Sequence, residues 1–398
     1  MARTAEKVRA PFNSNVLRWA RERVRLTPEV AAETAGVTPD QIRQWESGES
    51  VPTVKQARKL ARVYDLPFME FLSKETPKIK PVELVPDFRM HSGAEAPTEL
   101  YELLMIQSEA EETRLNTLDL YDMLGMEPPV LPDNFYWKLS EDTEVAASSV
   151  RAILQLPISE QLSRRGNDRA KFITAFRHYL ERAGIITMKN SGLAAFGARG
   201  ISLFASPFPV LIFSKEAPTA QAFTLAHELG HVTLQESGIS GPVGSAPSKT
   251  RAKQIEDWCD AFAGAFLMPA DEVEGVLHPV PSRPESAIDD GRIAAVANAF
   301  CVSRHAALIR LVKLRYVTSR FYWEVKRPQF LQQEKDFKGG GRSEYYGSRY
   351  RSQRGDLYTG LVLDAWSNGM ITNHNAAEFM GIKNIAHLDD IRTHFRSS

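Results

Sequence analysis

The run HELGH at residues 227–231 constrains the fold of this chain more than any other feature of its sequence. Its neighbours are mostly apolar, which predicts a largely buried helix: Ala222, Phe223, Leu225, Ala226, Leu229 and Val232. Residues four apart lie on one helix face, so His227 and His231 can direct two imidazoles at one ion. Buried histidine and glutamate side chains are costly without partners. The setting therefore favours a metal site over an exposed face that carries two unrelated histidines.

The residue types predict the chemistry of such a site. Zinc with three protein ligands keeps one position for water, whose pKa falls to about 7, so that hydroxide can attack a peptide carbonyl. Glu228 projects beside the histidines, where it can take the proton of that water and pass it to the leaving amine. A purely structural zinc site needs no such carboxylate. We therefore expect a zinc metallo-endopeptidase of the HExxH type.

The third protein ligand has to come from another element. Residues 254–268 predict a second helix with an apolar stripe that includes Trp258 and Phe262. Glu256 and Asp260 lie one turn apart near its start, and either could reach a metal. Their spacing does not choose between them.

The first part of the chain, residues 13–72, predicts an all-α domain of four or five short helices. Three helix starts are marked by a capping hydroxyl: Thr27, Thr38 and Thr53. A tight glycine-containing turn at residues 35–37 separates the second and third helices, as in a helix-turn-helix motif.

The rest of the chain predicts further domains. Residues 73–96 are rich in Lys, Pro and Glu, as in a linker, and residues 97–330 are expected to form the metal-binding domain. Three short β-rich runs predict a small sheet within it: residues 184–190, 200–206 and 209–215. Beyond the glycines at 339–341, residues 342–398 predict two or three short helices. The expected fold class is α+β, mostly helical.

Two segments resemble known families. Residues 26–66, LTPEVAAETAGVTPDQIRQWESGESVPTVKQARKLARVYDL, are similar to the lambda-repressor-type (Xre) helix-turn-helix family. The motifs FTLAHELGH and IEDWCDAFAGAFLMP resemble the ImmA/IrrE metallopeptidase family, and the resemblance extends to LVPDFR at residues 84–89. On this resemblance Glu256 is the third zinc ligand. Cys259 and Asp260 depart from the alanine and asparagine of the family motif but leave the ligand set intact.

The resemblance implies a zincin-like peptidase domain that carries out limited proteolysis of a partner protein, typically a DNA-binding repressor. Two other functions stay open. The chain could be a DNA-binding transcription regulator whose zinc site is structural or sensory and cuts no peptide. An antitoxin-like interaction protein is a third possibility, based on fold analogy alone.

The sequence leaves two features of the active site open. The run at residues 209–214 can offer a strand edge to an extended substrate, or it can simply be part of the sheet. The donor that stabilises the transition-state oxyanion is not identified. His278, Arg283 and His305 are its polar candidates.

Nucleic-acid binding is a separate question. In Xre-type domains the start of the third helix reads base edges in the major groove, which here points to Thr38, Arg43 and Gln44. Pro39 cannot donate a hydrogen bond and Asp40 repels phosphate, so docking on a partner's similar domain is an equal alternative. Three basic residues are expected near phosphates: Arg18, Arg21 and Lys55. The run at residues 342–354 interleaves arginine with tyrosine, as in single-strand binders, but a solvated linker is the preferred interpretation.

Composition limits the remaining possibilities. Lysine and arginine total 49 and aspartate and glutamate total 49, so the net charge is zero and any nucleic-acid contact must come from a local patch. The apolar runs are short, and the N-terminus has no apolar signal segment, so we expect a cytoplasmic protein without membrane contact. Cys259 and Cys301 lie far apart and are expected to be buried small hydrophobes.

Overall fold

The computed structural model describes residues 11–78, 84–87, 97–241, 250–281, 284–335 and 345–396. The chain divides into two compact units, Met1–Leu84 with His91–Glu109 and Val85–Met90 with Ala110–Ser398. The described residues are mostly helical and include one small mixed sheet, so the predicted α+β class is confirmed.

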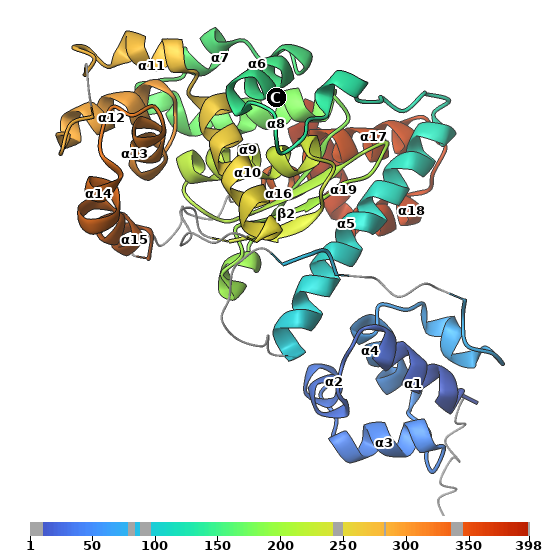
Figure 1. The fold of residues 1–398 in the computed structure, drawn as a ribbon. Helices are drawn as coiled ribbons and strands as arrows, with labels where there is room; N and C mark the ends of the chain where they lie inside the picture. Colours follow the sequence, from blue (N-terminus) through green and yellow to red (C-terminus); the bar gives the residue numbers. More distant parts are fainter. Residues whose placement is uncertain are drawn as a thin grey trace, which may run out of the picture. The chain divides into compact units, whose positions relative to one another are not determined.

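The first unit is helical, as predicted (Figure 1). Its elements are α1 (Ser14–Arg23), α2 (Pro28–Ala35), α3 (Pro39–Ser47), α4 (Val54–Val63) and a 3-10 helix (Phe68–Leu72). Thr38 and Gln41 form the expected capping box at the start of α3. Gly36 ends α2 with a φ of +66°, a left-handed conformation that glycine adopts readily, and this makes the tight turn of the motif.

The second unit contains most of the helices. Their bounds are α5 (Pro97–Met123, which begins in the first unit), α6 (Thr143–Ile153), α7 (Ile158–Leu162), α8 (Phe172–Arg182), α9 (Pro218–Thr233), α10 (Arg251–Leu267), α11 (Ala270–Val276), α12 (Asp290–Ala299), α13 (Arg304–Lys313), α14 (Ser319–Phe321), α15 (Arg327–Lys335), α16 (Tyr346–Arg354), α17 (Asp356–Ser367), α18 (Asn373–Phe379) and α19 (Ala386–Arg396). Short 3-10 turns span Asp133–Phe135, Gly166–Lys171 and Leu193–Phe196, and a π-helical turn spans Tyr322–Lys326.

The sheet has four strands in the order β1-β3-β2-β4. They are β1 (Ile186–Asn190), β2 (Gly200–Leu203), β3 (Val210–Ser214) and β4 (Gly238–Ser240). β1 is parallel to β3, whereas β2 is antiparallel to both β3 and β4. The three predicted runs form the first three strands. β4 was not predicted.

The hypothesis that β3 offers an edge to a substrate is wrong. Ile212 of β3 pairs with Met188 on one side and with Ile201 on the other, so β3 lies inside the sheet. All five of its residues are buried, which fits a continuous apolar run covered on both faces. Its role as part of the sheet, the other alternative, is the one observed.

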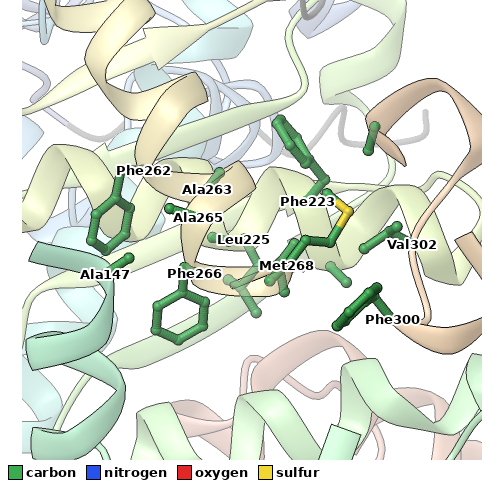
Figure 2. Close-up of a cluster of buried hydrophobic side chains, with 14 of the residues drawn as sticks. Ala147, Phe223, Leu225, Phe262, Ala263, Ala265, Phe266, Met268, Phe300 and Val302 are labelled. Atoms are coloured by element: carbon green, nitrogen blue, oxygen red, sulfur yellow. The ribbon is translucent and has the colours of Figure 1, made fainter. Parts of the chain in front are cut away.

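Helices α9 and α10 lie side by side, and α9 packs against β2 and β3 (Figure 1). The opposite side of α10 packs on α6, where Ala147 lies beside the rings of Phe262 and Phe266 (Figure 2). These side chains belong to one continuous core, which also includes Phe300 and Val302. The core holds both helices that carry the predicted metal ligands.

Buried polar groups hold the C-terminal end of α10. Its last carbonyls accept hydrogen bonds from Arg151 (to Phe266 O, 2.8 Å) and from Gln161 (to Leu267 O, 2.9 Å). Arg310 donates to the carbonyl of the capping residue Met268 at 2.8 Å. A helix end inside a core needs such partners, because its final carbonyls have none within the helix.

The C-terminal part contains four helices, α16 to α19, rather than the expected two or three. Residues 342–344 of the Arg/Tyr run lie outside the described residues, but Tyr346–Arg354 form α16. Tyr350 is buried, and Tyr346 stacks on His387 with ring centroids 3.8 Å apart. The prediction of a solvated linker is therefore wrong for the described part, because the rings of Tyr346 and Tyr350 pack within the C-terminal helices.

Two further predictions concern single features. Cys259 and Cys301 are free and buried, as expected.

Within the described ranges, no single helix is long and apolar enough to cross a membrane. Only the bent pair α12 and α13, at 100° to one another, meets that length and composition test together.

Candidate metal centre

Helix α9 buries the HELGH run almost completely. His227 is 5% exposed, and Glu228 and His231 are fully buried. Their spacing places both imidazoles on one helix face, with the two Nε2 atoms 3.3 Å apart. Two ring nitrogens therefore point at the same place.

Helix α10 brings the two candidate carboxylates to different sides of this pair. Glu256 Oε1 lies 3.0 Å from His231 Nε2, and Glu256 Oε2 lies 3.4 Å from His227 Nε2. Asp260 Oδ1 instead accepts a hydrogen bond from His227 Nδ1 at 2.9 Å. Glu256 thus shares the space between the two Nε2 atoms, while Asp260 holds one ring from its other nitrogen.

The charges of this cluster are coupled. Burial by itself would lower the pKa of His227, but the carboxylates of Glu256 and Asp260 more than offset it and raise that pKa well above its ordinary value. Burial opposes ionisation of Glu256 as well, yet the two histidines lower its pKa to about 2. The cluster is therefore built around an ionised carboxylate at Glu256.

Glu228 lies beside the cluster without joining it. Among the described residues, neither of its carboxylate oxygens has a hydrogen-bond partner of ordinary geometry. Burial raises its pKa, and the two imidazoles and the nearby Ser240 hydroxyl offset part of the rise. An orphaned carboxylate beside converging imidazoles fits a site that holds a cation and a water molecule.

The sheet closes the other side of the site. Gly200 of β2 faces Glu228, and a Cβ at Gly200 would lie 2.2 Å from Glu228 Oε1. Opposite Gly200, β4 carries Ser240, whose Oγ lies 3.2 Å from His231 Nε2. Sequence reasoning missed Ser240, because a strand of three residues has too little alternation to be recognised.

Cys259 provides a second potential donor. Its Sγ and one ring nitrogen from each of His227 and His231 lie within 4.8 Å of one another. Cys259 faces Gly230 of α9, since a Cβ at Gly230 would lie 3.3 Å from the sulfur. Burial raises the pKa of this thiol well above its ordinary value. The cluster therefore offers either a carboxylate or a thiol as its third donor.

Two segments of the chain match family models. Residues 182–312 match the model of the IrrE N-terminal-like domain, a peptidase family, and residues 17–71 match the helix-turn-helix model. The chain carries an IrrE N-terminal-like domain after a helix-turn-helix domain. A search among curated proteins finds no match. The suspected resemblance to both families is confirmed at the level of these domains.

All three candidate oxyanion donors fall within residues 182–312, and the structure describes two of them. His278 is exposed after α11, and His305 is buried in α13, 3.0 Å from the Tyr322 hydroxyl. Arg283 lies outside the described residues. Ser240 is the polar side chain that the structure adds to the site itself.

In the helix-turn-helix domain, the predicted DNA-contacting residues lie at the exposed start of α3. The Thr38 hydroxyl accepts a hydrogen bond from Gln41 N, and Gln44 is exposed. Arg43 donates to Asp40 at 3.0 Å and also to Glu29. Surface ion pairs of this kind contribute little, so a base or phosphate can replace them.

The expectation that Arg21 lies near a DNA phosphate is wrong. Arg21 is 8% exposed and forms a two-pronged pair with Glu46, at 2.7 Å from Nε and 2.9 Å from Nη2. This buried pair joins α1 to α3 and leaves the guanidinium no access to a phosphate. Lys55 is exposed at the start of α4, and Arg18 is half-exposed.

Proposed function

We propose that this protein is a zinc-dependent endopeptidase that cleaves a partner regulatory protein, a DNA-binding repressor being the expected substrate class. The observation that carries the proposal is the convergence of His227, His231 and Glu256 beside the orphaned carboxylate of Glu228, inside a peptidase-family domain. The helix-turn-helix domain serves to bring the enzyme to DNA or to the repressor.

The donor set fits zinc. Two imidazole nitrogens and one carboxylate are a common protein ligand set of catalytic zinc, and they leave a position for water. Asp260 accepts the Nδ1 hydrogen of His227, which keeps the Nε2 lone pair directed at the ion site. When bound, zinc supplies Lewis-acid activation of water and of the peptide carbonyl.

Glu228 carries the proton in this proposal. It accepts a proton from the attacking water and delivers it to the nitrogen of the leaving amine. Its burial supports this role, because a raised pKa brings the carboxylate closer to the operating pH. Gly200 contributes by leaving room for the carboxylate between α9 and β2.

The test is a comparison of cells that express the wild type or Glu228→Gln. New protein N-termini that appear only with the wild type identify the substrate, while metal analysis of both purified proteins should show equal zinc. Glu236→Gln, which alters a surface pair with Arg251 just beyond α9, is the matched control and should cleave normally. Cleavage by Glu228→Gln at the wild-type rate would contradict the proposal.

A second candidate is a transcription regulator with a structural or sensory zinc site. It is favoured by the thiol of Cys259 near both histidines, since zinc sites that only hold structure often use cysteine. Such a regulator would not need Glu228. Promoter occupancy that depends on zinc but is unchanged in Glu228→Gln would support this candidate.

A further inference from the structure

The outer edge of the sheet beside the site is β4. Of the two outer strands, β4 is the one that carries a side chain into the cluster, Ser240. Side chains alternate along a strand, so Ile239 is directed to the other face of the sheet. A polypeptide that lies along the outer edge of β4 therefore passes beside Ser240, whose Oγ lies 3.2 Å from His231 Nε2.

Only one residue of β4 offers its backbone to such a polypeptide. Gly238 and Ser240 pair with β2, where Arg199 N donates to Ser240 O at 2.9 Å. Because backbone groups alternate in direction along a strand, the N–H and C=O of Ile239 point away from β2. Pairing with β4 must use these two groups.

In this structure the position is taken by the chain itself. Ile239 N donates to Pro86 O at 2.9 Å, and Asp87 is the parallel bridge partner of Ile239. These residues belong to the LVPDFR run, which the proposed activity does not use. They are grouped with the second unit, although the chain up to Leu84 belongs to the first.

This contact buries little side-chain surface. Pro86 and Asp87 are both exposed, so their side chains bury little apolar surface. Proline has no N–H to add to the ladder, and the bridge is isolated rather than part of a named strand. A longer extended segment can form more backbone hydrogen bonds with the same edge.

We propose that Val85–Asp87 is a displaceable strap that competes with an extended polypeptide substrate for the outer edge of β4. The proposal rests on the peptidase function proposed above. Both segments need the N–H of Ile239, so they exclude one another. Cleavage is then restrained until the strap is released, and the substrate must present an extended segment rather than a folded surface.

The test uses zinc-loaded full-length protein and two probes. An acetylated pentapeptide with a C-terminal hydroxamate needs both the zinc and the strand edge, whereas acetohydroxamic acid needs only the zinc. The release variant combines Val85→Gly and Asp87→Gly, because glycine disfavours extended pairing through its entropy, and it keeps Pro86, which has no N–H to add to the ladder. The matched control introduces two glycines at exposed positions earlier in the chain: Glu75→Gly and Thr76→Gly.

We expect the release variant to bind the peptide hydroxamate roughly fivefold more tightly than the wild type and the control, because a weakening of the strap by about 1 kcal/mol lowers its competition for Ile239 N by that factor. Acetohydroxamic acid should bind all three alike. Equal peptide affinity in the three proteins overturns the strap. If acetohydroxamic acid does not bind the zinc-loaded wild type, the proposed catalytic zinc fails instead.

A locked variant tests the same competition from the other side. Asp87→Cys with Ile239→Cys places two thiols on bridge partners, while the native Cys259 and Cys301 are buried. Oxidation should abolish binding of the peptide hydroxamate and leave acetohydroxamic acid binding unchanged. The reduced form of the same protein is the control, and equal peptide binding before and after oxidation overturns the proposal.

Discussion

Gly200 of β2 stands so close to Glu228 of α9 that a Cβ on Gly200 would lie 2.2 Å from Oε1 and 2.5 Å from the carboxylate carbon. The backbone of Gly200 has no positive φ, so glycine is required here for space and not for conformation. The strand thereby sets the position of the carboxylate that we assign as the general base.

Replacing Gly200 with alanine should displace Glu228 and lower the cleavage rate by about a hundredfold, as misplacement of a reacting group by about 1 Å can do. Zinc content should stay at the wild-type level, because the proposed ligands come from α9 and α10. Cleavage of the identified substrate and metal analysis measure both effects. Gly275→Ala is the control, since a Cβ there meets open space. Wild-type cleavage by Gly200→Ala would exclude this role.

The two carboxylates of α10 should differ in their effect on the metal. Glu256→Ala removes the proposed third ligand and should abolish stoichiometric zinc binding, whereas Asp260→Asn should weaken affinity only about 10- to 100-fold, as loss of a histidine's outer partner does. Metal analysis and competition with a chelator distinguish these outcomes. Full zinc in Glu256→Ala, with loss in Asp260→Asn, would reverse the assignment.

Cys259→Ala addresses the thiol in the same cluster. We expect it to keep its zinc, and we expect the cobalt-substituted wild type to lack a thiolate charge-transfer band, because Glu256 already contacts both Nε2 atoms. Absorption spectroscopy of the cobalt form is the measurement. A thiolate band that disappears in Cys259→Ala would show that sulfur is a ligand and would favour the structural or sensory site.

Gln161 should matter for stability. It is fully buried, donates to Leu267 O at 2.9 Å and to Phe300 O at 2.6 Å, and accepts from Arg151. Gln161→Leu removes the donor to both carbonyls, although Arg151 keeps its bond to Phe266 O, and should lower the free energy of unfolding by about 3 kcal/mol. Urea unfolding measures the change. Gln254→Leu, an exposed change on α10, should stay within about 0.5 kcal/mol, and equal losses in both variants would refute the argument.

The role of the helix-turn-helix domain can be decided by a mobility-shift titration of the full chain. If α3 reads bases, Arg43→Ala should cost about 1–3 kcal/mol of binding free energy and relax preference at one base pair. Lys55→Ala should weaken binding to all duplexes alike and reduce the salt dependence. The probes are the region upstream of its own gene and a scrambled duplex. Equal, weak affinity for both would favour docking on a partner protein, as Pro39 and Asp40 already do.

The sequence by itself determined the local features of this protein. The capping box at Thr38 and the turn at Gly36 appear where the residues place them, because each depends on interactions within a few residues. The same holds for the pairing of His227 with His231, which follows from the helical repeat. The buried character of α9 was equally readable, since apolar residues surround the run on every side.

Only the tertiary structure decided which groups meet in the site. Glu256 and Asp260 are equivalent by spacing, and the angle between α9 and α10 directs one toward both Nε2 atoms and the other to Nδ1. Residues from four separate segments meet there, and no local periodicity relates them: Gly200, Glu228, Ser240 and Glu256. The sequence could not indicate the proposed strap either. Asp87 and Ile239 lie about 150 positions apart in the chain, and no local pattern predicts that they pair.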